Sequence, residues 1–233
     1  MTNDPKRLAI FGAVGKTGRH VVSQAAETGH RIRAIEPEWP DDAALPGGVE
    51  KVTGDLLNDD LVPLIEGCDA VISAIGLGLS ASSVLSPPPL YTKGTERLIE
   101  AMTRAGIPRL VVISASFVAS RDRGPVWFRA TASVALSNVF SQMGEMERLL
   151  RSSELDWTAV RPGWLLDAPL TADYRVTPEV IDEDVIRTRH ADLAHFMLSC
   201  IEDDAWSRQT PAIARPEPDS ASTPDKLLAD MGG

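Results

Sequence analysis

Three glycines near the N-terminus constrain this chain more than any other feature of its sequence. Gly12, Gly15 and Gly18 directly follow the apolar strand residues of RLAIFGA and precede a helical pattern that closes at Gly29. At this spacing the first glycine permits a sharp turn, the second lets backbone amides approach an anion, and the third lets helix and strand pack closely. The stretch therefore predicts a strand, a turn and a helix whose N-terminus binds the diphosphate of a dinucleotide.

The same stretch contains Gly15-Lys16-Thr17, the three letters that end the phosphate loop of nucleotide hydrolases. That loop needs a further glycine five positions before Gly15, where this chain has Ile10, an apolar residue of the expected strand. The spacing therefore favours the dinucleotide motif. Lys16 is expected near the phosphates, but not as a lysine that assists phosphoryl transfer.

Strand and helix patterns alternate along most of the chain. Strands are expected at 7–13, 30–35, 49–55, 69–76, 109–116 and 156–163 with a late one at 185–186, and helices at 15–28, 57–67, 91–106, within 125–153 and from 192. This order predicts an α/β fold with a doubly wound parallel sheet, in which functional residues gather at the carboxyl ends of the strands.

One domain is expected over residues 1–207, with a small substrate-side C-terminal part. Its substrate-side loops are expected at 77–90, 117–140 and 164–184. Residues 208–233 are rich in Pro, Ser and Asp, which predicts a partly disordered tail.

Composition limits the partners and the compartment. With 23 basic and 33 acidic side chains the net charge is −10, so nucleic acid and anionic membranes are disfavoured as partners. No apolar run approaches about 18 residues and the first residues, MTNDPKR, lack a secretory core, so a cytoplasmic protein is expected. Cys68 and Cys200 lack metal-ligand spacing and are expected to be buried thiols; no metal site is predicted.

An acidic residue ends the second expected strand. Glu36 stands 24 residues after Gly12, where a carboxylate can accept hydrogen bonds from the adenosine ribose and repel a 2′-phosphate. NADH is therefore expected to be preferred over NADPH. The alternative is a solvated loop charge beside Pro37.

The other candidate cofactor residues also follow strands, and Asp55 is placed to reach an adenine amino group. The full set expected at the dinucleotide is Gly12, Val14, Gly15, Lys16, Thr17, Gly18, Glu36, Asp55, Leu56, Ala74, Ile75, Gly76 and Ser114.

The segments GAVGKTG, VTGDL, SAIG, KGTERLIEAMTRAGIPRLVVIS and LDWTAVRPGWLLDAPLT together resemble the atypical short-chain dehydrogenase/reductases, and among them the flavin reductase/biliverdin reductase B family. The resemblance covers approximately residues 7–203. It implies a Rossmann fold that binds NAD(P)H and passes hydride to flavins or linear tetrapyrroles.

Three departures from that family affect the expected chemistry. The family usually carries arginine where this chain has Glu36, and histidine where it has Trp164. The Tyr-x-x-x-Lys pair of the wider superfamily is missing, because its position falls near Val139 and Met143. Ser116 does match the family's serine after the fifth strand.

Flavin reduction fits the remaining residues better than carbonyl reduction, because solvent can supply the proton. Ser114, Ser116, Arg161 and Trp164 are expected to surround the acceptor. Ser116 would hydrogen-bond the nicotinamide amide or the acceptor, and Trp164 would stack on the acceptor ring. The alternatives are a turn-capping serine and a core tryptophan.

The segment ASRDRGPVWFRA is expected to be a substrate-side loop. Its Arg121, Arg123 and Arg129, with Trp127 and Phe128, suit an anionic aromatic acceptor such as FMN, while a solvated loop is the alternative.

Four other polar residues are expected to have no catalytic role. Tyr91 and Lys93 are interpreted as surface residues, and His190 and His195 as structural ones.

The function that these features favour is an NAD(P)H-dependent oxidoreductase acting on a flavin-like or other conjugated aromatic small molecule. A redox-silent dinucleotide sensor and a non-redox isomerase or cyclase on the same fold are the alternatives. The oligomeric state and the identity of the acceptor stay open.

Overall fold

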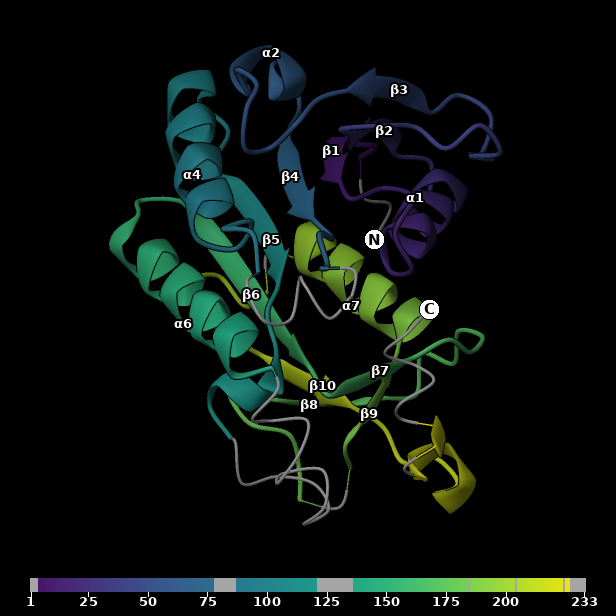
Figure 1. Cartoon of the computed structure of the whole chain (residues 1–233). Helices are drawn as coiled ribbons and strands as arrows, with labels where there is room; N and C mark the ends of the chain where they lie inside the picture. The colour runs from purple at the N-terminus through teal and green to yellow at the C-terminus, as the bar shows by residue number, and fades with distance from the viewer. Residues whose placement is uncertain are drawn as a thin grey trace.

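Figure 1 shows the computed structural model, which describes residues 4–77, 87–120, 136–183, 185–203, 205–223 and 225–226. Its main sheet consists of β1 (Arg7–Phe11), β2 (Arg31–Glu36), β3 (Glu50–Thr53), β4 (Ala70–Ser73), β5 (Arg109–Ile113), β6 (Asp156–Pro162), β8 (Arg175–Thr177) and β10 (Ala212–Ala214). A second sheet pairs β7 (Trp164–Leu166) with β9 (Arg187–Arg189) in parallel. The expected strands from β1 to β6 are present, most of them slightly shorter than predicted.

The strand order of the main sheet is β3-β2-β1-β4-β5-β6-β10-β8, and every neighbouring pair is parallel except β10 with β8. Strand order reverses between β1 and β4, which are direct neighbours. The expected doubly wound α/β sheet is confirmed. Crevices at the carboxyl ends of strands beside such a reversal bind ligands in this architecture.

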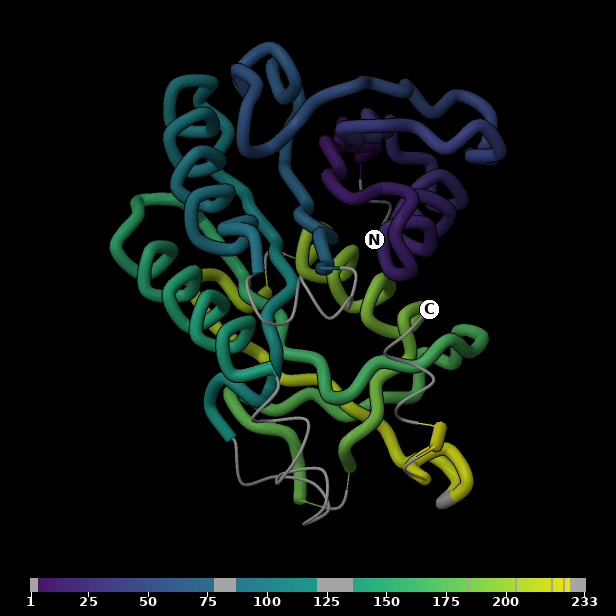
Figure 2. The backbone as a smooth tube through the Cα atoms, in the orientation of Figure 1, coloured from purple at the N-terminus to yellow at the C-terminus, as the bar shows by residue number. Residues whose placement is uncertain are grey.

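Helices cover both faces of the sheet (Figure 1). On one face α1 (Gly18–Glu27) packs against α7 (His190–Glu202), although these helices come from opposite ends of the chain (Figure 2). On the other face lie α2 (Val62–Ile65), α4 (Lys93–Ala105) and α6 (Ser137–Ser152), with α4 touching both others. Two short 3₁₀ turns, η1 (Ser116–Val118) and η2 (Asp219–Ser222), complete the described elements. Each face of the sheet thus has its own hydrophobic core.

The last strand corrects the predicted domain boundary. Residues 212–214 form β10 inside the sheet, where Ala212 and Ile213 are fully buried and pair with β6. The prediction that a tail begins at 208 is therefore wrong for this part of the chain. The late strand is also shifted, because β9 covers 187–189 instead of 185–186.

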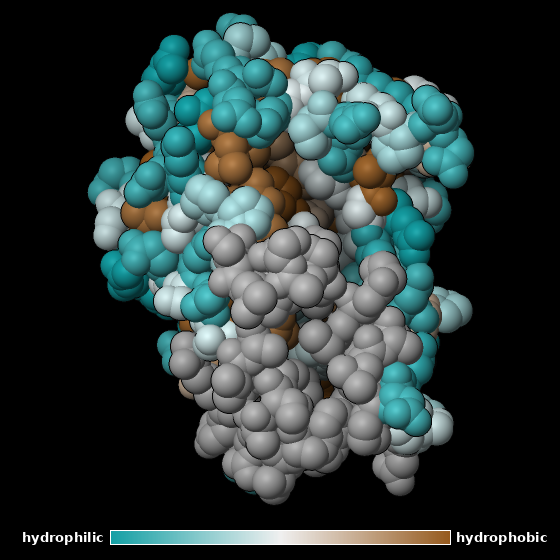
Figure 3. All heavy atoms as spheres, viewed as in Figure 1, coloured by the Kyte–Doolittle hydropathy of each residue, from teal (hydrophilic) through white to brown (hydrophobic). Residues whose placement is uncertain are grey.

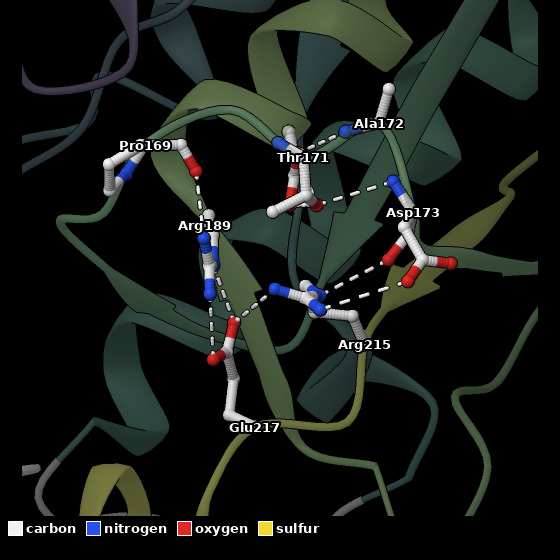
Figure 4. A network of polar contacts seen from close by, with 8 residues as sticks. Pro169, Thr171, Ala172, Asp173, Arg189, Arg215 and Glu217 are labelled. Atoms are coloured by element: carbon white, nitrogen blue, oxygen red, sulfur yellow. Dashed lines mark hydrogen bonds and ion pairs between the residues drawn. The ribbon is translucent and has the colours of Figure 1, made fainter.

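Charged side chains tie the segment after β10 to the rest of the domain (Figure 4). Arg189 donates two hydrogen bonds to the Glu217 carboxylate, at 2.6 and 3.0 Å, and Arg215 donates a third at 3.1 Å. The Arg189 guanidinium holds the pKa of Glu217 below its usual value. Arg215 also donates to the Asp173 carbonyl at 3.1 Å, so Arg189, Arg215 with Glu217, and Asp173 join three separate segments of the chain.

Both cysteine thiols are buried and free, as expected, and burial raises the pKa of Cys200 to about 12. Over the described ranges, no group of three or more His, Cys, Asp or Glu side chains is placed to hold a metal ion. None of the helices in the described part of the chain is both long and apolar enough to cross a membrane.

Candidate functional site

A cavity of about 480 Å³ lies at the carboxyl ends of β1, β4, β5 and β6. On the face drawn in Figure 3, hydrophobic side chains gather in a hollow between more hydrophilic rims. The cavity is lined by Val14, Gly15, Lys16, Thr17, Ala74, Ile75, Gly76, Leu77, Tyr91, Ile113, Ser114, Ala115, Phe117, Leu136, Val139, Phe140, Met143, Pro162, Gly163, Trp164, Leu165 and His190. This set joins the glycine loop to a mostly apolar chamber.

The glycine loop needs the absence of side chains at two points. A Cβ on Gly18 would lie 1.8 Å from the carbonyl oxygen of Gly12, so helix α1 could not pack this closely on the loop. Gly12 has a φ of +75°, and a Cβ there would lie 3.0 Å from the Ala74 carbonyl group of the neighbouring strand end. Glycine at both positions therefore allows the loop to pack closely against α1 and the end of β4, where the strand order reverses.

The N-terminus of α1 offers backbone donors to the cavity. Gly15 donates its amide to the Gly12 carbonyl at 3.2 Å, while the amides of Lys16, Thr17 and Gly18 have no acceptor among the described residues. Free amides at a helix N-terminus form an anion-binding site, which the helix dipole strengthens. The loop thus fits the diphosphate of a dinucleotide.

Glu36, the last residue of β2, contacts this loop through its side chain. Its carboxylate accepts a hydrogen bond from the Val14 amide at 2.7 Å, and only 8% of the residue is exposed. Burial raises the pKa of Glu36 above its ordinary value, while the Val14 hydrogen bond opposes that change. The interpretation of Glu36 as a solvated loop charge is therefore wrong.

His190, which the sequence analysis assigned to a structural role, lies at the cavity. It is the first residue of α7, is 7% exposed, and its Nδ1 lies 2.8 Å from the Thr17 hydroxyl. Burial, with help from the nearby positive charge of Lys16, lowers the pKa of His190 to about 4. No sequence spacing identifies this pair, because 173 positions separate its members.

Aromatic side chains form one wall of the cavity. Trp164 is 8% exposed and meets Phe117 edge-on, with ring centroids 6.3 Å apart, and Phe117 in turn lies 5.7 Å from Phe140. The α6 residues Val139 and Met143 line the same wall. Trp164 thus belongs both to the core and to the cavity surface, which the two interpretations from sequence had treated as alternatives.

Tyr91 is also a cavity residue, so its interpretation as a surface residue is wrong. It is 5% exposed, and burial raises its pKa to about 12, partly offset by a hydrogen bond from the Leu77 backbone. The phenol is therefore protonated at neutral pH. Lys93, two residues later, is exposed as expected.

Arg161 belongs to a buried ion pair rather than to the cavity wall. Its guanidinium donates to both oxygens of Glu147, at 2.8 and 2.6 Å, and to the Glu179 carbonyl at 2.9 Å. Ser114 does line the cavity, but its hydroxyl donates to Glu147 at 2.8 Å. The Ser116 hydroxyl donates to the Arg161 carbonyl at 2.8 Å. Both Arg161 and Ser116 are buried and lie outside the described lining, so the structure does not place them at the cavity as predicted.

Two predicted cofactor residues lie outside the described lining as well. Asp55 accepts hydrogen bonds from the Leu57 amide and the Asn58 side chain, at 2.7 and 2.6 Å, and so caps the turn after β3. Leu56 is buried beneath α4, where a Cβ on Gly94 would lie 2.5 Å from it. By contrast, the strand-end residues 74–76 line the cavity as expected. Arg121, Arg123, Trp127, Phe128 and Arg129 of the expected substrate loop lie outside the described residues.

Comparison with solved structures supports the Rossmann fold. A candidate NADH-flavin reductase from Streptococcus pneumoniae is 21% identical, with a TM-score of 0.71 over 91% of this chain and 100% of that chain. A short-chain dehydrogenase/reductase from Veillonella parvula, in complex with NADP, is 17% identical, with a TM-score of 0.70 over 91% of this chain and 95% of the other. The expected Rossmann fold is confirmed.

Comparison of sequences identifies the family. An uncharacterized sugar epimerase from Bacillus subtilis is 28% identical over 71% of this chain and 75% of its own length. The family model described as NAD(P)H-binding matches residues 12–204, from the first glycine of the loop to just beyond α7. The chain therefore belongs to the NAD(P)H-binding family.

Proposed function

We propose that this protein is a reductase that uses NAD(P)H to reduce a flat, conjugated small molecule, with FMN as the first candidate acceptor. The observation that carries this proposal is the continuity of the cavity, whose glycine loop leads directly to a wall of Phe117, Phe140 and Trp164. A volume of about 480 Å³ is in the range of small-molecule sites.

The cofactor would be held by the loop and by the strand ends. The free amides of the first turn of α1 suit the diphosphate, and Ala74, Ile75 and Gly76 provide an apolar floor. When bound, the dinucleotide supplies a hydride. The protein would supply proximity and a chamber that excludes water, which together account for much of the acceleration in such transfers.

The acceptor end of the cavity favours an aromatic ring over a sugar. Its wall consists of aromatic and aliphatic side chains, and Tyr91 is a further polar residue of the cavity lining. A sugar ring would leave several hydroxyl groups without partners there, which is unfavourable when they are buried. A protonated Tyr91 is suited to donate a hydrogen bond or a proton to a reduced acceptor.

Titration of the purified protein with NADH and with NADPH by calorimetry, followed by NADH oxidation assays with FMN and other conjugated acceptors, tests this function. Binding followed by acceptor-dependent oxidation supports the reductase. Binding without oxidation by any acceptor favours a redox-silent sensor instead. If neither dinucleotide binds at millimolar concentration, the dinucleotide site and the reductase are both rejected.

Replacement of Trp164 by Leu is expected to raise the KM for FMN about 10-fold, because the stacking surface is lost while an apolar side chain remains. The dissociation constant for NADH should stay within about 2-fold of the wild-type value, since the glycine loop is unchanged. Trp39→Leu, which alters a half-buried tryptophan beside Lys51 away from the cavity, is the matched control. Equal loss of affinity for both ligands in Trp164→Leu would argue for a general packing defect.

Glu36→Arg is expected to shift the preference from NADH towards NADPH by about 100-fold, or about 2.7 kcal/mol. The wild-type carboxylate lies at the end of β2, where it would accept ribose hydroxyls and repel a 2′-phosphate. Glu36→Gln removes the charge alone and should give an intermediate ratio. Calorimetry of all three proteins with both dinucleotides measures the ratio, and an unchanged ratio would place the adenosine ribose away from Glu36.

A further inference from the structure

His190, at the start of α7, contacts Thr17 of the glycine loop, which is far away in the sequence. Its Nδ1 lies within hydrogen-bond distance of the Thr17 hydroxyl, while Nε2 has no hydrogen-bond partner among the described residues, and His190 lines the cavity. Thr17 itself carries one of the free amides at the start of α1. The imidazole therefore contacts the side chain of a residue whose backbone amide would bind an anion.

We propose that His190 is a dinucleotide-binding residue, which takes up a proton when the diphosphate binds and so strengthens binding as the pH falls. The inference rests on the dinucleotide site proposed above and adds a residue to it from a distant part of the chain. In the free protein the imidazole is neutral and hydrogen-bonded to Thr17.

The charges around His190 explain why the free imidazole stays neutral. Lys16 of the loop and Arg19 and His20 of α1 disfavour a positive charge there, while Asp167 after β7 favours it more weakly than burial opposes it. A bound diphosphate would add negative charge to this cluster. The pKa of His190 should then rise from about 4 towards its ordinary value.

Two other charged groups near the start of α7 are already engaged. Asp192, in the first turn of α7, accepts hydrogen bonds from Thr171 and Ala172, and Arg189 is paired with Glu217. Glu36 is the remaining carboxylate of the loop, and its protonation at low pH would weaken ribose binding. His190 and Glu36 would therefore change the affinity in opposite directions, so variants of each separate their effects.

The test is calorimetric titration with NAD⁺, which is stable in mild acid, at about pH 5.5 and about pH 7.5 in buffers of different ionisation enthalpy. Wild-type protein, and more clearly the Glu36→Gln background, should take up a fraction of a proton per ligand at the lower pH. Affinity should rise about 3- to 10-fold between the two conditions. In His190→Gln, which keeps a neutral donor, both the proton uptake and the rise in affinity at the lower pH should be lost.

Two controls separate this role from a structural one. His195→Gln changes a histidine of the same helix whose Nδ1 lies 2.7 Å from the Tyr174 hydroxyl, outside the described cavity lining, and should keep the proton uptake. His20→Gln tests the neighbouring imidazole and should keep it too. Binding of NAD⁺ with no proton uptake in the Glu36→Gln background, or with an uptake that survives His190→Gln, would overturn the inference while leaving the proposed function intact. Absence of binding at both pH values would reject both.

Discussion

Gly18→Ala is expected to weaken dinucleotide binding by about 100-fold or more, which corresponds to at least about 2.7 kcal/mol. The new Cβ would lie 1.8 Å from the Gly12 carbonyl oxygen, an impossible separation, so α1 would have to move away from the loop. Such a movement displaces the amides of Lys16 and Thr17 from the cavity. The free energy of unfolding should also fall by about 3 kcal/mol, because the clash is between backbone and a short side chain that cannot rotate away.

A graded series of alanine variants makes this result specific. At Gly15 the Cβ would lie 3.3 Å from the Gly12 carbonyl oxygen, and at Gly47 it would meet nothing within 4 Å. Binding should therefore weaken in the order Gly47, Gly15, Gly18, as measured by calorimetry, with far-ultraviolet circular dichroism showing that each variant is folded. Wild-type affinity in a folded Gly18→Ala protein would mean that the dinucleotide does not depend on this loop.

Glu147→Ala is expected to lower the free energy of unfolding by about 3 to 5 kcal/mol, because it leaves the buried Arg161 guanidinium without its carboxylate. Glu147 is 1% exposed and Arg161 is 4% exposed, and the Ser114 hydroxyl loses its acceptor in the same variant. The additional contact from Arg151 contributes little, because that side chain is 47% exposed. Urea denaturation followed by circular dichroism measures the loss.

The double variant Glu147→Leu with Arg161→Met should be more stable than Glu147→Ala, since it removes both charges and keeps apolar volume. Glu145→Ala, on the exposed side of the same helix, should change stability by less than about 0.5 kcal/mol. If the double variant is as unstable as the single one, packing rather than charge burial explains the loss. In that case the unpaired charge of Arg161 would not be the cause of the instability of Glu147→Ala.

The sequence predicted features that depend on neighbouring residues. Strands β1, β4 and β5 are short apolar runs, β2 alternates polar and apolar residues, and the glycine spacing is a local pattern, so all of these could be recognised along the chain. Glu36 was predicted to lie at the adenosine ribose because its distance from the glycines to the end of the second strand is characteristic of this fold, and that role stays a prediction.

Features that depend on distant contacts were missed. Arg161 follows the pattern of a strand-end residue, but its partner Glu147 is on a different element, so the sequence could not show that the guanidinium is occupied. Tyr91 stands in a polar stretch but is buried in the hydrophobic cluster that also contains residues of α4 and α6. His190 meets Thr17 only when α7 docks on α1. Short apolar β10 lies among Pro, Ser and Asp residues, which hid it as well.

The late position of β10 affects how the chain avoids aggregation during synthesis. Until residues 212–214 have left the ribosome, one side of β6 is an open strand edge with unpaired amides and carbonyls. This edge belongs to a strand that is buried along nearly its whole length in the finished domain, so its unpaired backbone groups are suited to pair with another nascent chain. Truncation before residue 212 would make that exposed state permanent and should send the protein into inclusion bodies.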